Sequence, residues 1–160
     1  MCVSTNGTLI TAERARRLKQ YDPLYFQVSL DGGTAITNDS IRGKGVFSRA
    51  LRGLELLAAE NHSLTVNSVL TRHSFSELDR LYEIAASFNA KLRVTRLRPS
   101  GRGQDVWGEL HPTREQYREF TAWLGDHPDV LTADSFFHLN AFGNKLPGLD
   151  VCGAATATCC

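Results

Sequence analysis

Polar side chains alternate with apolar ones along LYFQVSLDG (residues 24–32), a segment that is expected to form a strand. Successive side chains of a strand point to opposite faces, so Gln27, Ser29 and Asp31 share one face. A hydroxyl and a carboxylate near the carboxyl end of a parallel strand are typical of a ligand cavity, where they exchange hydrogen bonds with a bound molecule. Gly32 and Gly33 then allow a sharp turn beside the ligand. An exposed edge strand that ends in a DG turn is the alternative interpretation.

Further polar residues fall where the other expected strands end. They are Thr5, Asn6, Thr71, Arg72, Arg96, Arg98 and Asp134. Because the carboxyl ends of parallel strands meet at one edge of a sheet, this set indicates a polar ligand with hydroxyls and a carboxylate or phosphate. Guanidinium groups bind such anions at two points, and a carboxylate accepts from a pair of hydroxyls. Taken one at a time, each residue is explained as well by a solvated loop or a helix cap.

Three of the four cysteines, Cys152, Cys159 and Cys160, lie within the last nine residues. In a reducing compartment such clustering indicates metal or redox chemistry before a structural disulfide. Loops commonly carry iron–sulfur ligands, whereas zinc sites more often use CxxC pairs, which this sequence lacks. A cluster ordinarily takes four ligands, so the three thiols form an incomplete set.

Composition and missing motifs narrow the classes of function. The five histidines show no ligand spacing, and nucleophile-elbow, GxxxxGK[ST] and HExxH motifs are absent, so hydrolase and kinase interpretations have no anchor. With 18 basic and 17 acidic residues the net charge is +1, which argues against a nucleic-acid or membrane-surface partner. No apolar run is long enough to span a bilayer and no secretory leader is recognisable, so a cytoplasmic location is expected.

Strand and helix patterns alternate along the chain, which predicts an α/β fold with a parallel sheet. Strands are expected near 2–4, 24–30, 64–71, 91–97 and 130–132, and helices near 12–19, 46–60, 74–88 and 113–124. Three of these helices begin at capping sequences: Thr11, Ser74-x-x-Glu77 and Thr113-x-x-Gln116. Residues 31–45 are expected to form a long polar loop, and 139–160 an irregular tail. Partly polar strands favour a barrel-like sheet around a cavity over a doubly wound sheet.

Several short motifs, taken in order, resemble the radical SAM enzymes that carry a C-terminal SPASM domain. They are Thr5-Asn6-Gly7, Ser29-Leu30-Asp31-Gly32, Arg42-Gly43, Val69-Leu70-Thr71-Arg72 and Arg98-Pro99-Ser100-Gly101. Within that family, the longer stretches TRLRPSGRGQDVWGELHPT (95–113), ADSFFHL (133–139) and LPGLDVCGAATATCC (146–160) resemble the mycofactocin maturases.

The resemblance implies a partial (β/α)6 barrel, with residues 1–138 as its C-terminal part and 139–160 as the beginning of an auxiliary iron–sulfur (SPASM) region. It implies S-adenosylmethionine bound beside a [4Fe-4S] cluster whose reduction yields a deoxyadenosyl radical. Asn6, Ser29, Asp31 and Arg42 match cofactor-binding positions, and Cys152 and Cys159 match ligands of an auxiliary cluster. The implied substrate is a small precursor peptide presented by a small peptide-binding chaperone. Its C-terminal Val-Tyr is decarboxylated oxidatively and then cross-linked.

The CxxxCxxC loop that holds the radical-generating cluster of this family does not occur in the 160 residues, nor does its glycine- and glutamate-containing motif. Because the family carries the cysteine loop upstream of the matched strands, we expect a central fragment of a maturase that is inactive alone. One alternative is a non-catalytic module that captures a peptide by strand addition at an open sheet edge. Another is a decayed gene product without a role.

Overall fold

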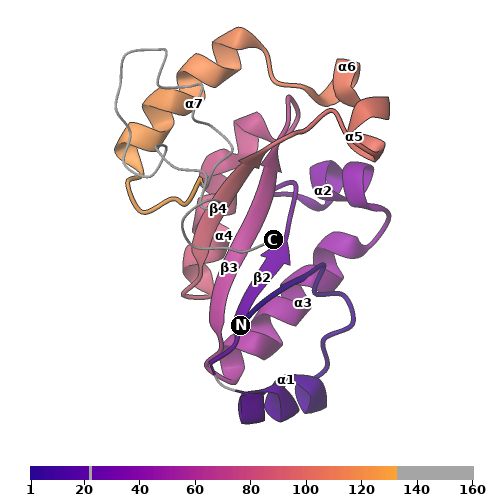
Figure 1. Ribbon diagram of the computed structural model, residues 1–160, viewed down its shortest axis with the longest axis vertical. Helices are drawn as coiled ribbons and strands as arrows, with labels where there is room; N and C mark the ends of the chain where they lie inside the picture. Colours follow the sequence, from indigo (N-terminus) through magenta and orange to yellow (C-terminus); the bar gives the residue numbers. More distant parts are fainter. Residues whose placement is uncertain (22, 133–160) are drawn as a thin grey trace.

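The computed structural model describes residues 1–21 and 23–132. Its centre is a four-stranded parallel sheet. Its strands follow chain order: β1 (Cys2–Thr5), β2 (Tyr25–Ser29), β3 (Ser63–Leu70) and β4 (Lys91–Arg96) (Figure 1). Leu131 adds a single parallel bridge to Arg93, so the strand expected near 130–132 is present as one residue pair. The α/β class with a parallel sheet is therefore confirmed.

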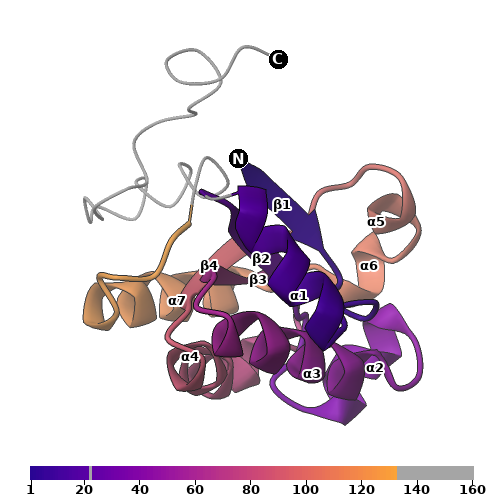
Figure 2. The ribbon, with the colours of Figure 1, turned by 90° about the horizontal axis from the view of Figure 1, so that it is seen from below.

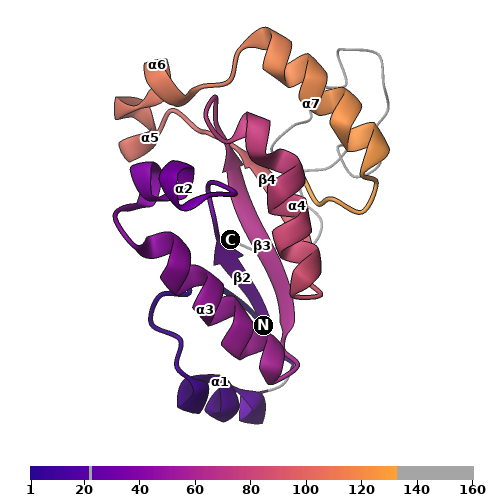
Figure 3. The ribbon, with the colours of Figure 1, turned by 180° about the vertical axis from the view of Figure 1, so that it is seen from behind.

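Helices cover one face of this sheet. The chain forms α1 (Ala12–Leu18), α2 (Ala35–Arg42), α3 (Val46–Ala59), α4 (Leu78–Ser87), α5 (Arg102–Asp105), α6 (Trp107–Leu110) and α7 (Arg114–Asp126). Short 3-10 turns, Lys19–Tyr21 and Phe75–Glu77, follow α1 and precede α4. Figure 3 shows α3 and α4 in front of the strands, and Figure 2 shows the same two helices beneath the sheet. The core between these layers includes Phe26, Val28, Leu54, Leu57, Val66 and Val94, all buried.

The opposite face of the sheet, seen from the front in Figure 1, is polar. Along β2, Phe26 and Val28 are buried under the helices while Gln27 and Ser29 are half-buried on the other side. The same alternation along β3 leaves Thr65 and Asn67 half-buried. β2 pairs with β1 on one side and with β3 on the other, so the interpretation of 24–32 as an edge strand is wrong.

The prediction of a long loop over residues 31–45 is wrong, because this segment contains helix α2. Thr34 caps this helix by accepting a hydrogen bond from the Thr37 amide at 3.2 Å. The segment TNDS is poor in strong helix formers, so intrinsic propensity concealed the helix. Contacts with the neighbouring elements override that propensity.

The prediction of a capping box at Ser74 and Glu77 is also wrong. The Ser74 side chain caps no helix and instead accepts a hydrogen bond from the Thr71 amide at 3.0 Å. The Glu77 side chain reaches across to the start of α2. By contrast, the Thr11 cap and the Thr113–Gln116 capping box are both confirmed.

Candidate functional site

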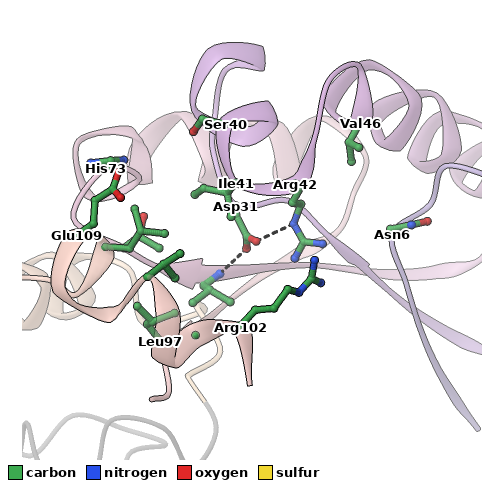
Figure 4. Close-up of a pocket in the computed structure, with 15 residues that line it drawn as sticks. Asn6, Asp31, Ser40, Ile41, Arg42, Val46, His73, Leu97, Arg102 and Glu109 are labelled. Atoms are coloured by element: carbon green, nitrogen blue, oxygen red, sulfur yellow. Dashed lines mark hydrogen bonds and ion pairs between the residues drawn. The ribbon is translucent and has the colours of Figure 1, made fainter. Parts of the chain in front are cut away.

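A cavity of about 680 Å³ opens at the carboxyl ends of the strands, between α2 on one side and α5 and α6 on the other (Figure 4). Its size falls within the range of about 300 to 1,000 Å³ that is usual for small-molecule sites. The lining residues used below are Asn6, Asp31, Arg42, Val69, Thr71, Leu97, Arg102 and Gly103. The sequence places a ligand site at this edge of the sheet, and the cavity lies there.

An ion pair between Asp31 and Arg42 forms one wall of the cavity. Oδ2 of Asp31 lies 2.7 Å from Nε of Arg42, although the N–H is not aligned for a hydrogen bond. Oδ1 of Asp31 accepts a hydrogen bond from the Val69 amide at 2.9 Å. The aspartate side chain is 7% exposed and that of the arginine 23%. Asp31 therefore anchors the guanidinium, which keeps an accessible part on the cavity side.

Helix α2 is held over the strand ends by two side chains. Asn38 is buried and accepts a hydrogen bond from the Asp31 amide at 2.9 Å. Glu77 accepts from the Gly33 amide at 2.7 Å and from the hydroxyls of Thr34 and Thr37 at 2.9 and 2.7 Å. The close approach requires glycine at position 32, where a Cβ would lie 2.6 Å from the Asn38 amide nitrogen. These contacts fix the helix that carries Arg42.

Asp39 ties α2 to the start of α3. Its carboxylate accepts hydrogen bonds from the amides of Phe47, at 2.8 Å, and of Gly45. The bond from Phe47 is the largest of the effects that hold the pKa of Asp39 below its ordinary value of 3.8. An ionised carboxylate at the first turn of α3 also interacts favourably with the helix dipole.

Asn6 lies at the edge of the cavity, on the loop that follows β1. The loop folds back on itself, since Asn6 Oδ1 accepts a hydrogen bond from the Thr8 amide at 3.1 Å. The loop after β1 also packs against α3 so closely that a Cβ at Gly53 would lie 2.3 Å from the Gly7 carbonyl oxygen. A glycine in the middle of α3 thus allows the loop to bring Asn6 to the strand ends.

Arg102, on α5, supplies a second cation to the cavity. Figure 4 shows its side chain and that of Arg42 extending toward the same space from facing walls. Arg102 forms no ion pair with another residue of the described ranges. Two carboxylates line the cavity, and Glu109 lies away from the two guanidinium groups, beside His73 (Figure 4). The part of the cavity around Arg42 and Arg102 therefore holds one carboxylate, Asp31, and is suited to a ligand that carries a negative charge.

The base of α6 is packed by an aromatic cluster. The His111 ring lies 4.0 Å from the Trp107 ring, centroid to centroid, and its Nε2 is 3.3 Å from the Tyr117 hydroxyl oxygen. Burial, and to a smaller extent the charge of Arg72, lowers the pKa of His111. The imidazole is therefore neutral near pH 7 and adds no charge beside the cavity.

The structure brings together three of the four residues assigned to the cofactor from the sequence: Asn6, Asp31 and Arg42. Ser29 does not line the cavity and is half-buried on the open face of β2. Among the other strand-end residues, Thr71 lines the cavity and Arg72 donates a hydrogen bond to the His111 carbonyl. Arg96 and Arg98 line a neighbouring hollow instead.

Two residues of the site were missed by sequence reasoning. Arg102 lies in the RPSGRG segment, which gave no helix signal, and it reaches the cavity because α5 turns back over the strand ends. For Glu77, the sequence predicts a role in the capping box of its own segment. A glutamate three residues after a serine is the usual pattern of a capping box. The actual partners of Glu77, Thr34 and Thr37, become visible only in the folded structure.

The described residues do not provide a metal centre. Residues 1–21 and 23–132 contain no group of three or more His, Cys, Asp or Glu side chains placed to hold a metal ion. Cys2 is the one cysteine in these ranges, and it is exposed. Cys152 and Cys159, proposed as cluster ligands, lie outside the described residues, as do Cys160, His138 and Asp134. Within the same ranges, no helix has the length and apolar character needed to cross a membrane.

The fold and its cavity define a class of protein: an α/β protein with a parallel sheet and a cavity of small-molecule size at the carboxyl ends of its strands. The sequence profile of the "Radical SAM superfamily" matches residues 1–85, and the chain belongs to this superfamily. The chain is 48% identical to the mycofactocin maturase MftC of Mycolicibacterium smegmatis, over 98% of its own length and 41% of that protein. It spans about two fifths of the length of such curated relatives.

More distant similarities concern the sequence in one case and the fold alone in two others. An AdoMet-dependent heme synthase of Methanosarcina barkeri is 33% identical over 76% of this chain and 35% of that protein. The solved structure of anSMEcpe with bound AdoMet shares the fold, with a TM-score of 0.62 and 19% identity over 91% of this chain and 38% of that one. Streptococcus suis SuiB bound to its precursor peptide SuiA gives a TM-score of 0.61 and 14% identity, covering 93% and 36% of the two chains.

Proposed function

We propose that this chain contributes the S-adenosylmethionine-binding wall of a radical SAM peptide maturase of the mycofactocin type. The observation that carries the proposal is the cavity at the strand ends, where Arg42 and Arg102 extend toward the same space and Asp31 is the carboxylate beside them. Sequence similarity to the mycofactocin maturase along almost the whole chain supports the same assignment.

In this proposal the chain's own residues bind and orient the cofactor. Arg42, anchored by Asp31, pairs with the cofactor's carboxylate, and Arg102 adds a second positive charge on the facing wall. Asp31 uses one contact on each of its oxygens and keeps lone pairs for a ligand hydroxyl. Asn6 offers an amide at the cavity edge, and Ser29 a hydroxyl on the open face of β2. When bound beside a reduced cluster, S-adenosylmethionine supplies a deoxyadenosyl radical.

The iron–sulfur chemistry of the family is not assigned to the described residues, because they lack a set of thiolates. We propose Cys152 and Cys159 as ligands of an auxiliary cluster and 139–160 as the beginning of the SPASM region. The radical-generating CxxxCxxC motif does not occur in the 160 residues. Without it, the 160-residue polypeptide is expected to produce no 5′-deoxyadenosine by itself.

The proposed substrate is a precursor peptide ending in Val-Tyr, presented by a small peptide-binding chaperone. Oxidative decarboxylation of the tyrosine and cross-linking to the valine are the proposed reaction. The similarity to the mycofactocin maturase supports this substrate, and SuiB provides a relative in fold that is solved with a precursor peptide. We propose that the reaction takes place in the cytoplasm.

Calorimetric titration with S-adenosylmethionine and with its decarboxylated analogue tests the cofactor site. The analogue lacks only the carboxylate, so we expect the unchanged chain to bind it about tenfold or more weakly, the worth of a charge-assisted hydrogen bond. Arg42→Gln should weaken the cofactor and abolish this difference between the two ligands. Arg52→Gln serves as the matched control, because Arg52 is an exposed α3 arginine paired with Glu55 outside the cavity.

If the Arg42→Gln variant still preferred S-adenosylmethionine over the decarboxylated analogue to the same extent, Arg42 would not be the residue that binds the carboxylate. No binding of either ligand by the unchanged chain would contradict the proposed function. The alternative, a non-catalytic module that adds a peptide strand at the edge of β1, predicts peptide binding that S-adenosylmethionine does not affect.

A further inference from the structure

A second hollow, of about 460 Å³, lies on the open polar face of the sheet. Side chains of three neighbouring strands line it, among them Gln27, Asn67, Arg93 and Thr95. Val69, Leu97 and Gly103 line both this hollow and the cavity at the strand ends. The two spaces therefore share a wall, and a molecule in the hollow lies next to a ligand in the cavity.

Arg93 is a cation without a counter-charge in this hollow. The residue is half-buried on β4, and its Nη1 donates a hydrogen bond to Gln27 Oε1 at 2.9 Å. Its Nε is buried and has no hydrogen-bond partner, and no carboxylate within residues 1–21 and 23–132 forms an ion pair with it. Removing a charged group from water without compensation is costly, so a site of this kind is suited to an anionic ligand.

Neighbouring strands hold the Arg93 guanidinium in a fixed orientation. The amide of Gln27 donates to the Ser4 hydroxyl at 3.3 Å, which directs its carbonyl oxygen toward Arg93. With Nη1 bound to Gln27 and Nε buried, Nη2 is the donor that remains for a ligand, and a charge-assisted hydrogen bond from it suits an oxygen of a carboxylate. Asn67, the register partner of Arg93 on β3, adds an amide beside the same position.

We propose that Arg93 binds the C-terminal carboxylate of the peptide substrate, in the hollow adjoining the cofactor cavity. This inference rests on the proposed function, which supplies a peptide as the second ligand. The shared wall places the end of that peptide beside the cofactor, as a reaction at the terminal residue requires.

The test is a titration of the full 160-residue chain, saturated with S-adenosylmethionine, with two fluorescently labelled peptides. Both peptides end in Val-Tyr, one as the free acid and one as the C-terminal amide. We expect the chain to prefer the free acid about tenfold to a hundredfold, the effect of one charge-assisted pair. Arg93→Gln should reduce this preference several-fold, with any remainder supplied by Arg96 and Arg98, which line the same hollow. Arg93→Lys should keep more of the preference because a point charge remains.

Lys91→Gln is the matched control, since Lys91 is an exposed cation with the same orientation two residues earlier on β4 and does not line the hollow. It should leave the preference unchanged, and thermal unfolding of each variant checks that the fold is retained. Equal binding of acid and amide by the unchanged chain would overturn the inference. So would an acid preference of unchanged size in a folded Arg93→Gln variant.

Failure of this inference is distinguishable from failure of the proposed function. Binding of S-adenosylmethionine without peptide binding, or without acid preference, overturns the Arg93 assignment and leaves the cofactor site standing. Absence of S-adenosylmethionine binding contradicts the proposed function itself. An acid preference that depends on Arg93 in a chain that binds no cofactor would still support the carboxylate site.

Discussion

Glu77→Ala should destabilise the chain and weaken its cofactor site together. Glu77 accepts three hydrogen bonds from α2 and the turn before it, at 2.7, 2.9 and 2.7 Å. A hydrogen bond to a charged group contributes about 1.5 to 3 kcal/mol when it is well buried. Glu77 is only half-buried and the freed hydroxyls regain water, so we expect about 1 kcal/mol for each bond and a loss of about 3 kcal/mol in all.

Urea unfolding followed by circular dichroism measures the loss in stability, and titration with S-adenosylmethionine measures the effect on the site. Glu77→Gln should lose less, because the amide oxygen can still accept from the Gly33 amide while the threonine hydroxyls rotate to meet its NH₂ group. Glu83→Ala, at an exposed position of α4, is the control and should change stability by less than about 0.5 kcal/mol. If Glu77→Ala resembled Glu83→Ala in both measurements, the contacts with α2 would not be what positions Arg42.

Two further perturbations address the elements around the cavity. The depressed pKa of Asp39 means that its carboxylate stabilises the fold fully above pH 3.8 and loses this effect as the pH falls through the lower folded-state value. The difference in Tm between the unchanged chain and Asp39→Asn should therefore shrink from pH 7 to pH 3, and a constant difference would contradict the assignment. Gly53→Ala should cost about 2 kcal/mol or more, because its Cβ would meet the Gly7 carbonyl oxygen at 2.3 Å. Gly125→Ala on α7, where a Cβ has open space, should be neutral or stabilising, and similar unfolding curves for the two alanine variants would refute the close approach.

The sequence predicts the sheet well because its strands carry local signals. The two-faced pattern of 24–30 and 64–71 places apolar residues under the helices and polar ones on the open face, as observed. The capping box at Thr113 and Gln116 also lies within one turn of chain, and it forms as expected. A local pattern of a few residues predicts the structure correctly when no residue distant in sequence binds the same side chain.

The site was harder to predict because its contacts join residues far apart in sequence. Asp31 and Arg42 could be assigned to one ligand by resemblance, yet nothing in their types reveals that they pair with each other. Glu77 lies 44 residues from the Gly33 amide that it binds, so its local pattern was misleading. Helix α2 was missed for the same reason, since its stability depends on these tertiary contacts more than on its own composition.

The hydrogen bond from the Val69 amide to Asp31 also favours one register of β3 against β2. The regular pairing of β2 with β3 ends at Ser29 and Asn67, and the Asp31 side chain then takes the place of a main-chain acceptor for β3. A slip of β3 by two residues would keep every side chain on its proper face, so burial of apolar groups alone discriminates weakly against it. The slip would, however, remove the Val69 amide from a carboxylate whose side chain is 7% exposed. The residue that orients Arg42 therefore also makes a misaligned sheet unfavourable, and selection for the ligand site and for correct strand alignment falls on the same aspartate.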